Sequence, residues 1–205
     1  MKVLGITGGI GSGKTYICDI FRHLGIPAYG SDERARALYL EDERLLKEVQ
    51  GLLGADIVEN GVLRTDRIAR RIFGSAPLLQ QLEALVHPAV LRDFGRWKDR
   101  MAEQAQRRGE RIPFVIFESA ILLQKPSVRR AADRVLTVSA PEEVRIERVM
   151  RRDGSDRERV LERISSQWSD RERERLSDFI IFADGKRALL PQIVPVMERM
   201  SRTED

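Results

Sequence analysis

The stretch "GGIGSGKT", residues 8–15, decides the fold class of this 205-residue chain. It matches the pattern G-x-x-x-x-G-K-[ST] in full, and it lies between a short apolar run at residues 2–7 and a stretch whose apolar residues have helical spacing. A strand, a glycine-rich loop and a helix in that order are typical of a phosphate-binding loop, in which backbone N–H groups and the helix N-terminus face phosphate oxygens. The sequence therefore predicts a nucleotide site at this loop.

The residues of the loop have separate expected roles. Lys14 is expected to reach the β- and γ-phosphates of ATP, and the hydroxyl of Thr15 is expected to bind Mg²⁺. Most basic residues of the chain are arginines, so a lysine within a glycine-rich loop is conspicuous. The predicted cofactor-binding residues here are Gly9, Gly11, Ser12, Gly13, Lys14, Thr15 and Tyr16.

Four more short apolar runs predict further strands, at residues 26–29, 112–119, 133–140 and 178–185. Most of the runs are separated by stretches with helical spacing. Helices are expected at 14–25, 32–54, 142–153, 156–176 and near the C-terminus. In residues 60–74, a turn at Asn60-Gly61 is expected to precede a helix. Two more helices are expected in 77–108, separated near His87-Pro88. This alternation predicts an α/β fold with a P-loop NTPase-type parallel sheet, similar to that of nucleotide kinases.

The length fits a single kinase domain, residues 1–205, with specialised segments. Residues 1–30, 110–142 and 177–205 are expected to form the nucleotide-binding core. The long helical insertion at 31–109 is expected to form a lobe for the acceptor substrate, because it is too long for one crossover. The arginine-rich segment 143–176 is expected to form a lid over ATP.

Composition excludes several classes of protein. With 42% apolar residues the chain is globular, and 36 basic against 32 acidic residues give a mixed surface with a mild basic bias. The only cysteine, Cys18, excludes an internal disulfide, and no apolar run reaches the roughly 18 residues of a membrane span. A cytoplasmic protein without a membrane partner is expected, as a monomer or small homo-oligomer.

Two carboxylates are candidates for the substrate side of the site. Glu118 ends the strand at 112–119, and ligands collect at the carboxyl ends of parallel strands. Asp32, in "IPAYGSDERAR", follows the run at 26–29 and could handle a substrate hydroxyl. Each also has an ordinary interpretation: Glu118 could face solvent or cap a turn, and Asp32 could cap the helix that follows.

Three other side chains are weaker candidates. Arg148 and Arg152 are four residues apart on one helical face, where they could stabilise a transferring phosphoryl group. A solvated face of alternating charges is the ordinary interpretation. His87 lies in the expected acceptor lobe, where an isolated histidine is often structural.

The motifs of other P-loop proteins are missing. The sequence holds no D-x-x-G motif. Its only asparagine, Asn60, is followed by Gly61 and not by lysine, so the N-K-x-D motif is also missing and a GTPase switch is disfavoured. Acidic residues alternate with the bases of the arginine-rich helices, which disfavours a nucleic-acid partner. Another P-loop kinase and a nucleotide-dependent RNA-binding module stay open as alternatives.

Seven segments in order resemble the dephospho-coenzyme A kinase family. "LGIPAYGSDERAR" resembles its "LGIPVIDADEIAR", and "LEALVHPAV" resembles its "LE-x-x-x-HP-x-x". The other five are "GITGGIGSGKT", "NGVLRTDRIARRIF", "FVIFESAILLQ", "RVMRRDGSDRERVLERISSQ" and "SDFIIFADG". The resemblance implies transfer of the γ-phosphate of ATP, with Mg²⁺, to the 3′-hydroxyl of dephospho-coenzyme A.

The resemblance also implies residue roles. Asp32 takes the position of the second Asp of "DAD" and would accept or orient the proton of the acceptor hydroxyl, with Lys14 and Arg148 as the other catalytic residues. Arg152 matches the second lid arginine and would bind the nucleotide, while His87 and Glu118 would bind the acceptor substrate. This chain departs from the family pattern at Gly30 (the first Asp of "DAD"), Thr65 (an Arg), Ala120 (a Pro), Gln124 (a Glu) and Ala183 (an Asn).

Overall fold

The computed structural model describes residues 1–202, and its contacts divide the chain into two compact units. The first comprises residues 1–30 and the chain from residue 98 onward; the second comprises residues 31–97. The last three residues of the predicted core segment 177–205 lie outside the described residues. The functions predicted for the segments stay predictions.

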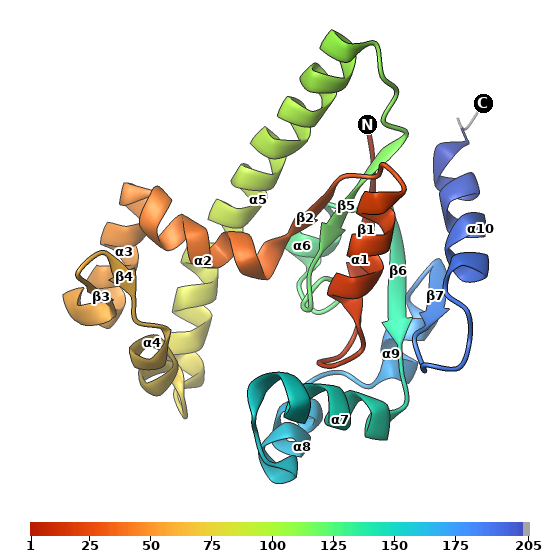
Figure 1. Cartoon of the computed structure of the whole chain (residues 1–205). Helices are drawn as coiled ribbons and strands as arrows, with labels where there is room; N and C mark the ends of the chain where they lie inside the picture. The colour runs from red at the N-terminus through yellow and green to blue at the C-terminus, as the bar shows by residue number, and fades with distance from the viewer. Residues whose placement is uncertain (203–205) are drawn as a thin grey trace. The chain divides into compact units, whose positions relative to one another are not determined.

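A five-stranded parallel sheet forms the centre of the first unit (Figure 1). Its strand order is β2 (Ala28–Gly30), β5 (Phe114–Glu118), β1 (Lys2–Thr7), β6 (Arg134–Ser139) and β7 (Phe179–Phe182). Each of the five expected apolar runs contributes one strand. The predicted α/β class and parallel sheet are therefore confirmed.

Helices cover the sheet because its strands are apolar on both sides. One face packs against α1 (Lys14–His23) and α10 (Leu190–Ser201), in a core that joins Ile6 and Leu136 of the sheet to Phe21 and Ile193 of these helices. On the other face, a Cβ built on Gly5 would lie 2.5 Å from a methyl group of Leu122. Only a glycine lets the segment after β5, which includes α6 (Pro126–Arg129), pack so closely.

The segment predicted to form the lid, residues 143–176, falls on three helices rather than two. The first is α7 (Glu142–Asp153), as expected. The single helix expected at 156–176 is wrong: α8 (Arg157–Ser165) ends before α9 (Asp170–Arg175). Ser169 begins α9 with a capping box, in which its side chain and that of Glu172 satisfy each other's backbone N–H groups. The cap starts a new helix within a charged run that otherwise has helical spacing.

The second unit holds α2 (Ser31–Glu41), α3 (Glu43–Leu53), the short 3₁₀ helix η1 (Ala55–Ile57), the strands β3 (Val58–Glu59) and β4 (Val62–Leu63), and α4 (Thr65–Ile72). The single helix expected at 32–54 is wrong, because Asp42 caps α3 by accepting a hydrogen bond from the N–H of Leu45 at 3.0 Å. The turn expected at Asn60-Gly61 is present and joins β3 to β4 as a two-residue hairpin, with φ of 51° and 75°.

The remaining helix, α5 (Ala76–Arg108), contains the boundary between the units at Trp97 and Lys98. The break expected near His87-Pro88 is wrong, since α5 continues through Pro88. A proline within a helix costs about 3 kcal/mol. Val86, Ala89 and Val90 are all buried around it, and their packing holds the helix together at this position.

Candidate active site

The glycine-rich loop joins the carboxyl end of β1 to the start of α1, beside α7 (Figure 1). Gly11 and Gly13 have φ of 76° and 98°, in the left-handed region that other residues rarely adopt. A Cβ on Gly11 would lie 2.5 Å from the carbonyl oxygen of Arg145 and 2.9 Å from a methyl group of Val149. The loop therefore needs glycine both for its backbone angles and for its close contact with α7.

Three cationic side chains hold the carbonyl groups of the loop. The Lys14 ammonium donates to the carbonyl oxygens of Gly8 at 3.1 Å and Gly9 at 3.4 Å. The Arg145 guanidinium donates from Nε to Ile10 at 2.9 Å. Arg148 donates from Nη1 to Gly11 at 3.4 Å and Ser12 at 3.2 Å. Five consecutive carbonyl groups, at residues 8–12, thus accept from positive charges.

This arrangement leaves hydrogen-bond donors for an anion. Within residues 1–202, neither the N–H of Gly11 nor that of Gly13 has a partner. The buried Ser12 hydroxyl and Arg145 Nη2 also have no hydrogen-bond partner there. Buried donors without partners are costly, and phosphate oxygens would satisfy the Ser12 hydroxyl and the N–H groups of the loop. The residues present therefore fit the triphosphate of ATP.

Residues around the start of α9 also support the glycine-rich loop. The N–H of Ile10 donates to Oε1 of Gln167 at 2.8 Å, while Arg145 Nη1 donates to Asp170 at 2.9 Å. Sequence reasoning missed Arg145 and Asp170. The available signal was position: Arg145 precedes Ile146 and Val149 on the buried side of α7, where an arginine needs partners.

The predicted lid arginines differ in their surroundings. Arg148 is half-buried and donates from Nη2 to the Ala183 carbonyl at 2.7 Å, which links α7 to the residue after β7. A main-chain oxygen thus accepts this bond, so it does not depend on the asparagine that the family has at this position. Arg152 is exposed and pairs with Asp153, Nε to Oδ1, at 2.7 Å. The prediction that Arg152 binds nucleotide remains a prediction.

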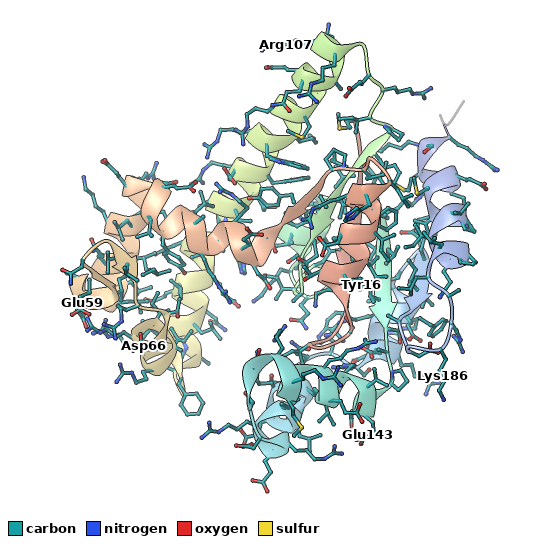
Figure 2. All side chains as sticks on the ribbon, in the orientation of Figure 1. Tyr16, Glu59, Asp66, Arg107, Glu143 and Lys186 are labelled. Atoms are coloured by element: carbon teal, nitrogen blue, oxygen red, sulfur yellow. The ribbon has the colours of Figure 1, made fainter. Side chains whose placement is uncertain are left out.

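Other predicted residues of the first unit lie near the carboxyl end of the sheet. Thr15 and Tyr16, in the first turn of α1, are exposed, and Tyr16 is labelled in Figure 2. Glu118 ends β5 and is half-buried; it aligns with Ile6 of β1 and with Gly30 of β2. The Thr15 hydroxyl is a suitable oxygen ligand for Mg²⁺, which commonly takes few protein ligands beside phosphates and water.

Asp32 and His87 belong to the second unit. Asp32 lies in the first turn of α2, two residues after the end of β2, and its carboxylate is exposed. It accepts a hydrogen bond from the Ser31 hydroxyl at 3.4 Å. Because α2 begins at Ser31, Asp32 lies inside the helix and is not its N-cap. Its negative charge in the first turn still stabilises the helix N-terminus. His87 is half-buried in α5.

Two arginines stand beside Thr65, where the family pattern has an arginine. Arg64 pairs with Asp66 at 3.2 Å and also with Glu59. Arg67 pairs with Glu59 at 3.0 Å. Both cations are thus held by carboxylates of the second unit.

Comparison with known proteins decides the family. The family model described as dephospho-CoA kinase matches residues 2–188. The chain belongs to the dephospho-CoA kinase family. Members of this family are transferases, and the chain is accordingly a kinase that uses ATP. A dephospho-CoA kinase of Porphyromonas gingivalis is 38% identical over 97% of this chain and 94% of its own length, and one of Bacteroides fragilis is 34% identical over 95% and 90%.

Solved structures show the same fold. The Thermus thermophilus protein TT1252 superimposes with a TM-score of 0.77 at 29% identity, over 98% of both chains. A dephospho-CoA kinase from Campylobacter jejuni gives a TM-score of 0.56 at 20% identity, also over 98% of both chains, which speaks for the fold alone. None of the helices in the described part of the chain has the length and apolar composition that crossing a membrane would need.

Proposed function

We propose that this protein transfers the γ-phosphate of ATP to the 3′-hydroxyl of dephospho-coenzyme A, giving coenzyme A and ADP. The observation that carries the proposal is the glycine-rich loop with its carbonyl groups held by three cations, in a chain of the dephospho-CoA kinase family. Phosphoryl transfer needs positioning and charge stabilisation more than covalent chemistry. The loop supplies fixed donors and positive charge for that purpose.

The donor side of the reaction falls to the loop and its cations. The N–H groups of the loop, the Ser12 hydroxyl and the Lys14 ammonium bind the phosphates and fix their direction. Arg148, already placed against the Gly11 and Ser12 carbonyl groups, adds charge next to the transferring group. Thr15 would hold Mg²⁺, which when bound neutralises charge on the phosphates.

On the acceptor side, Asp32 accepts or orients the proton of the 3′-hydroxyl. Support comes from its exposed carboxylate and its place directly after β2, whose last residue aligns with Glu118. Because Gly30 stands where the family has another acid, Asp32 does this without that neighbouring carboxylate. Glu118 and His87 are proposed to contact the acceptor. Arg64 or Arg67 would replace the family arginine at Thr65.

The proposal extends to Mg²⁺ as cofactor and to the cytoplasm as compartment. The choice of Mg²⁺ is supported by the Thr15 hydroxyl at the start of α1, next to the loop. The compartment is supported by the single cysteine, which excludes an internal disulfide.

A coupled assay of ADP release tests the reaction. The purified protein is incubated with ATP and Mg²⁺ and with dephospho-coenzyme A, nucleoside monophosphates or shikimate as separate acceptors. ADP release that depends on dephospho-coenzyme A, with coenzyme A as the product by mass, is expected. Faster turnover of another acceptor would overturn the proposal in favour of a different P-loop kinase.

A further inference from the structure

Arg145, Asp170 and Arg173 form a buried cluster directly behind the glycine-rich loop. Arg145 is 5% exposed and Arg173 is 1% exposed. Asp170 accepts from Arg145 Nη1 at 2.9 Å and from Arg173 Nη1 at 3.2 Å. Arg173 also donates to the Trp168 carbonyl oxygen. Two guanidinium groups therefore share one carboxylate in the interior.

The cluster lacks a negative charge. One carboxylate against two guanidinium groups leaves a net positive charge, and Nη2 of both Arg145 and Arg173 has no hydrogen-bond partner within residues 1–202. Burial and the neighbouring Arg145 lower the pKa of Arg173, while Asp170 opposes that change. Glu172 also attracts Arg173, but its carboxylate is exposed and bonded to Ser169. Buried charge without compensation is costly, so the cluster favours binding of an anion.

The unpartnered nitrogen of Arg145 points at the loop. A Cβ built on Gly9 would lie 2.4 Å from Arg145 Nη2, so the guanidinium is packed against the loop backbone itself. The same side chain holds the Ile10 carbonyl through Nε, while Gln167 holds the N–H of that residue. Arg145 thus fixes the orientation of a peptide group of the loop and places positive charge behind it.

We propose that Arg145 is a positioning residue for the nucleotide, and that the phosphates of ATP or ADP supply the negative charge that the Arg145–Asp170–Arg173 cluster lacks. The cluster raises the affinity of the loop for phosphate and connects nucleotide binding to the stability of α9. The inference rests on the proposed function only in taking an adenine nucleotide as the ligand; it does not depend on the acceptor.

The test compares two substitutions with opposite effects on charge. Arg145→Gln removes the excess positive charge, and Asp170→Asn increases it with little change of shape. We expect both to lower the Tm of the protein without nucleotide. We expect Arg145→Gln to weaken ADP binding about tenfold or more, measured by calorimetry with Mg²⁺, as loss of a charged donor would. Asp170→Asn is expected to keep ADP affinity within about threefold or to strengthen it.

Two further variants complete the design. Arg151→Gln removes an exposed arginine from the same helix and is expected to leave ADP affinity and KM for ATP unchanged. Arg145→Lys keeps the charge but cannot reach both Ile10 and Asp170 as a guanidinium does, so an intermediate affinity is expected. It also serves as the second test if Arg145→Gln does not fold.

In kinetic assays, Arg145→Gln should raise KM for ATP and leave KM for the acceptor unchanged, whereas a loss of stability alone would change neither. ADP affinity of Arg145→Gln within twofold of the unmodified protein would overturn the inference. So would equal losses of ADP affinity in Arg145→Gln and Asp170→Asn. If the unmodified protein binds ADP but does not phosphorylate dephospho-coenzyme A, the proposed function fails while the binding comparison still decides this inference.

Discussion

Replacing Gly11 by alanine adds one methyl group at the point where the glycine-rich loop meets α7. At φ of 76° an alanine costs about 1–2 kcal/mol of backbone energy. Its Cβ would also lie 2.5 Å from the Arg145 carbonyl oxygen, at least about 0.5 Å too close for a carbon and a main-chain atom that cannot rotate away. The loop must therefore move away from α7.

The movement should affect catalysis more than folding. A displacement of about 1 Å in a site that positions phosphates can lower the rate about 10²-fold. We expect Gly11→Ala to lower kcat/KM for ATP by about 10- to 100-fold, because the required displacement is somewhat smaller. Steady-state ADP release with dephospho-coenzyme A measures the kinetic change, and thermal unfolding measures the loss of stability.

Gly154→Ala provides a matched control. Gly154 ends α7 with φ of 64°, and a Cβ built there would meet nothing within 4 Å. It carries the same kind of backbone cost without the contact, so its Tm should fall while kcat/KM stays within about twofold. If Gly11→Ala keeps more than half of kcat/KM, or if Gly154→Ala loses as much activity, the reasoning about the contact with α7 is refuted.

Three further predictions concern individual side chains. Asp32→Asn should lower kcat about 10²-fold or more with unchanged ADP binding, because a positioned base contributes about 10²–10⁴; near-normal turnover in the acceptor-saturated assay would remove Asp32 from its role. Lys14→Ala should abolish most turnover and weaken ADP binding by calorimetry, since it removes the ammonium group that holds the carbonyl groups of Gly8 and Gly9, and an active variant would contradict the site assignment. Burial raises the pKa of the Cys18 thiol, so less thiolate is present at any given pH. Cys18 should therefore resist a thiol reagent at pH 8 in the folded protein and react fully in denaturant. Rapid reaction of the folded protein would contradict the buried position of Cys18.

The sheet and the glycine-rich loop could be predicted because their signals are local. An apolar run such as residues 112–119 predicts a buried strand whatever surrounds it, and the loop pattern combines glycine geometry with a lysine at a fixed position. The break expected at Pro88 failed for the opposite reason. Whether a helix continues through a proline depends on the burial of Val86, Ala89 and Val90, which is a tertiary property.

The sequence predicted the phosphate-binding loop of the candidate site. It did not predict all of the side chains that hold this loop in place. Spacing of i,i+4 singled out Arg148 and Arg152, yet the structure places Arg145 and Arg148 against the loop and pairs Arg152 with Asp153. A charged run that reads as a solvated face contains two arginines that are almost fully buried. Ile10, the loop partner of Arg145, lies 135 residues away along the chain, and no short-range pattern reports such a contact. Asp170 does stand at i,i+3 spacing from Arg173, but that spacing does not report that the pair is buried.

The hydrogen bonds of α7 also restrict how the predicted lid can move. Arg145 and Arg148 connect this helix to the carbonyl groups of residues 10–12, and Arg148 connects it to Ala183 at 2.7 Å. A rigid movement of the whole segment 143–176 would break these bonds to charged donors, each worth about 1.5–3 kcal/mol when buried. It would also disturb the loop that it is meant to cover. If the predicted closure over ATP occurs, we expect it to involve α8 and the end of α7, where Arg152 and Arg163 pair with Asp153 at the surface. The earlier turns of α7 would stay in place, because Arg145 and Arg148 bind the loop carbonyl groups.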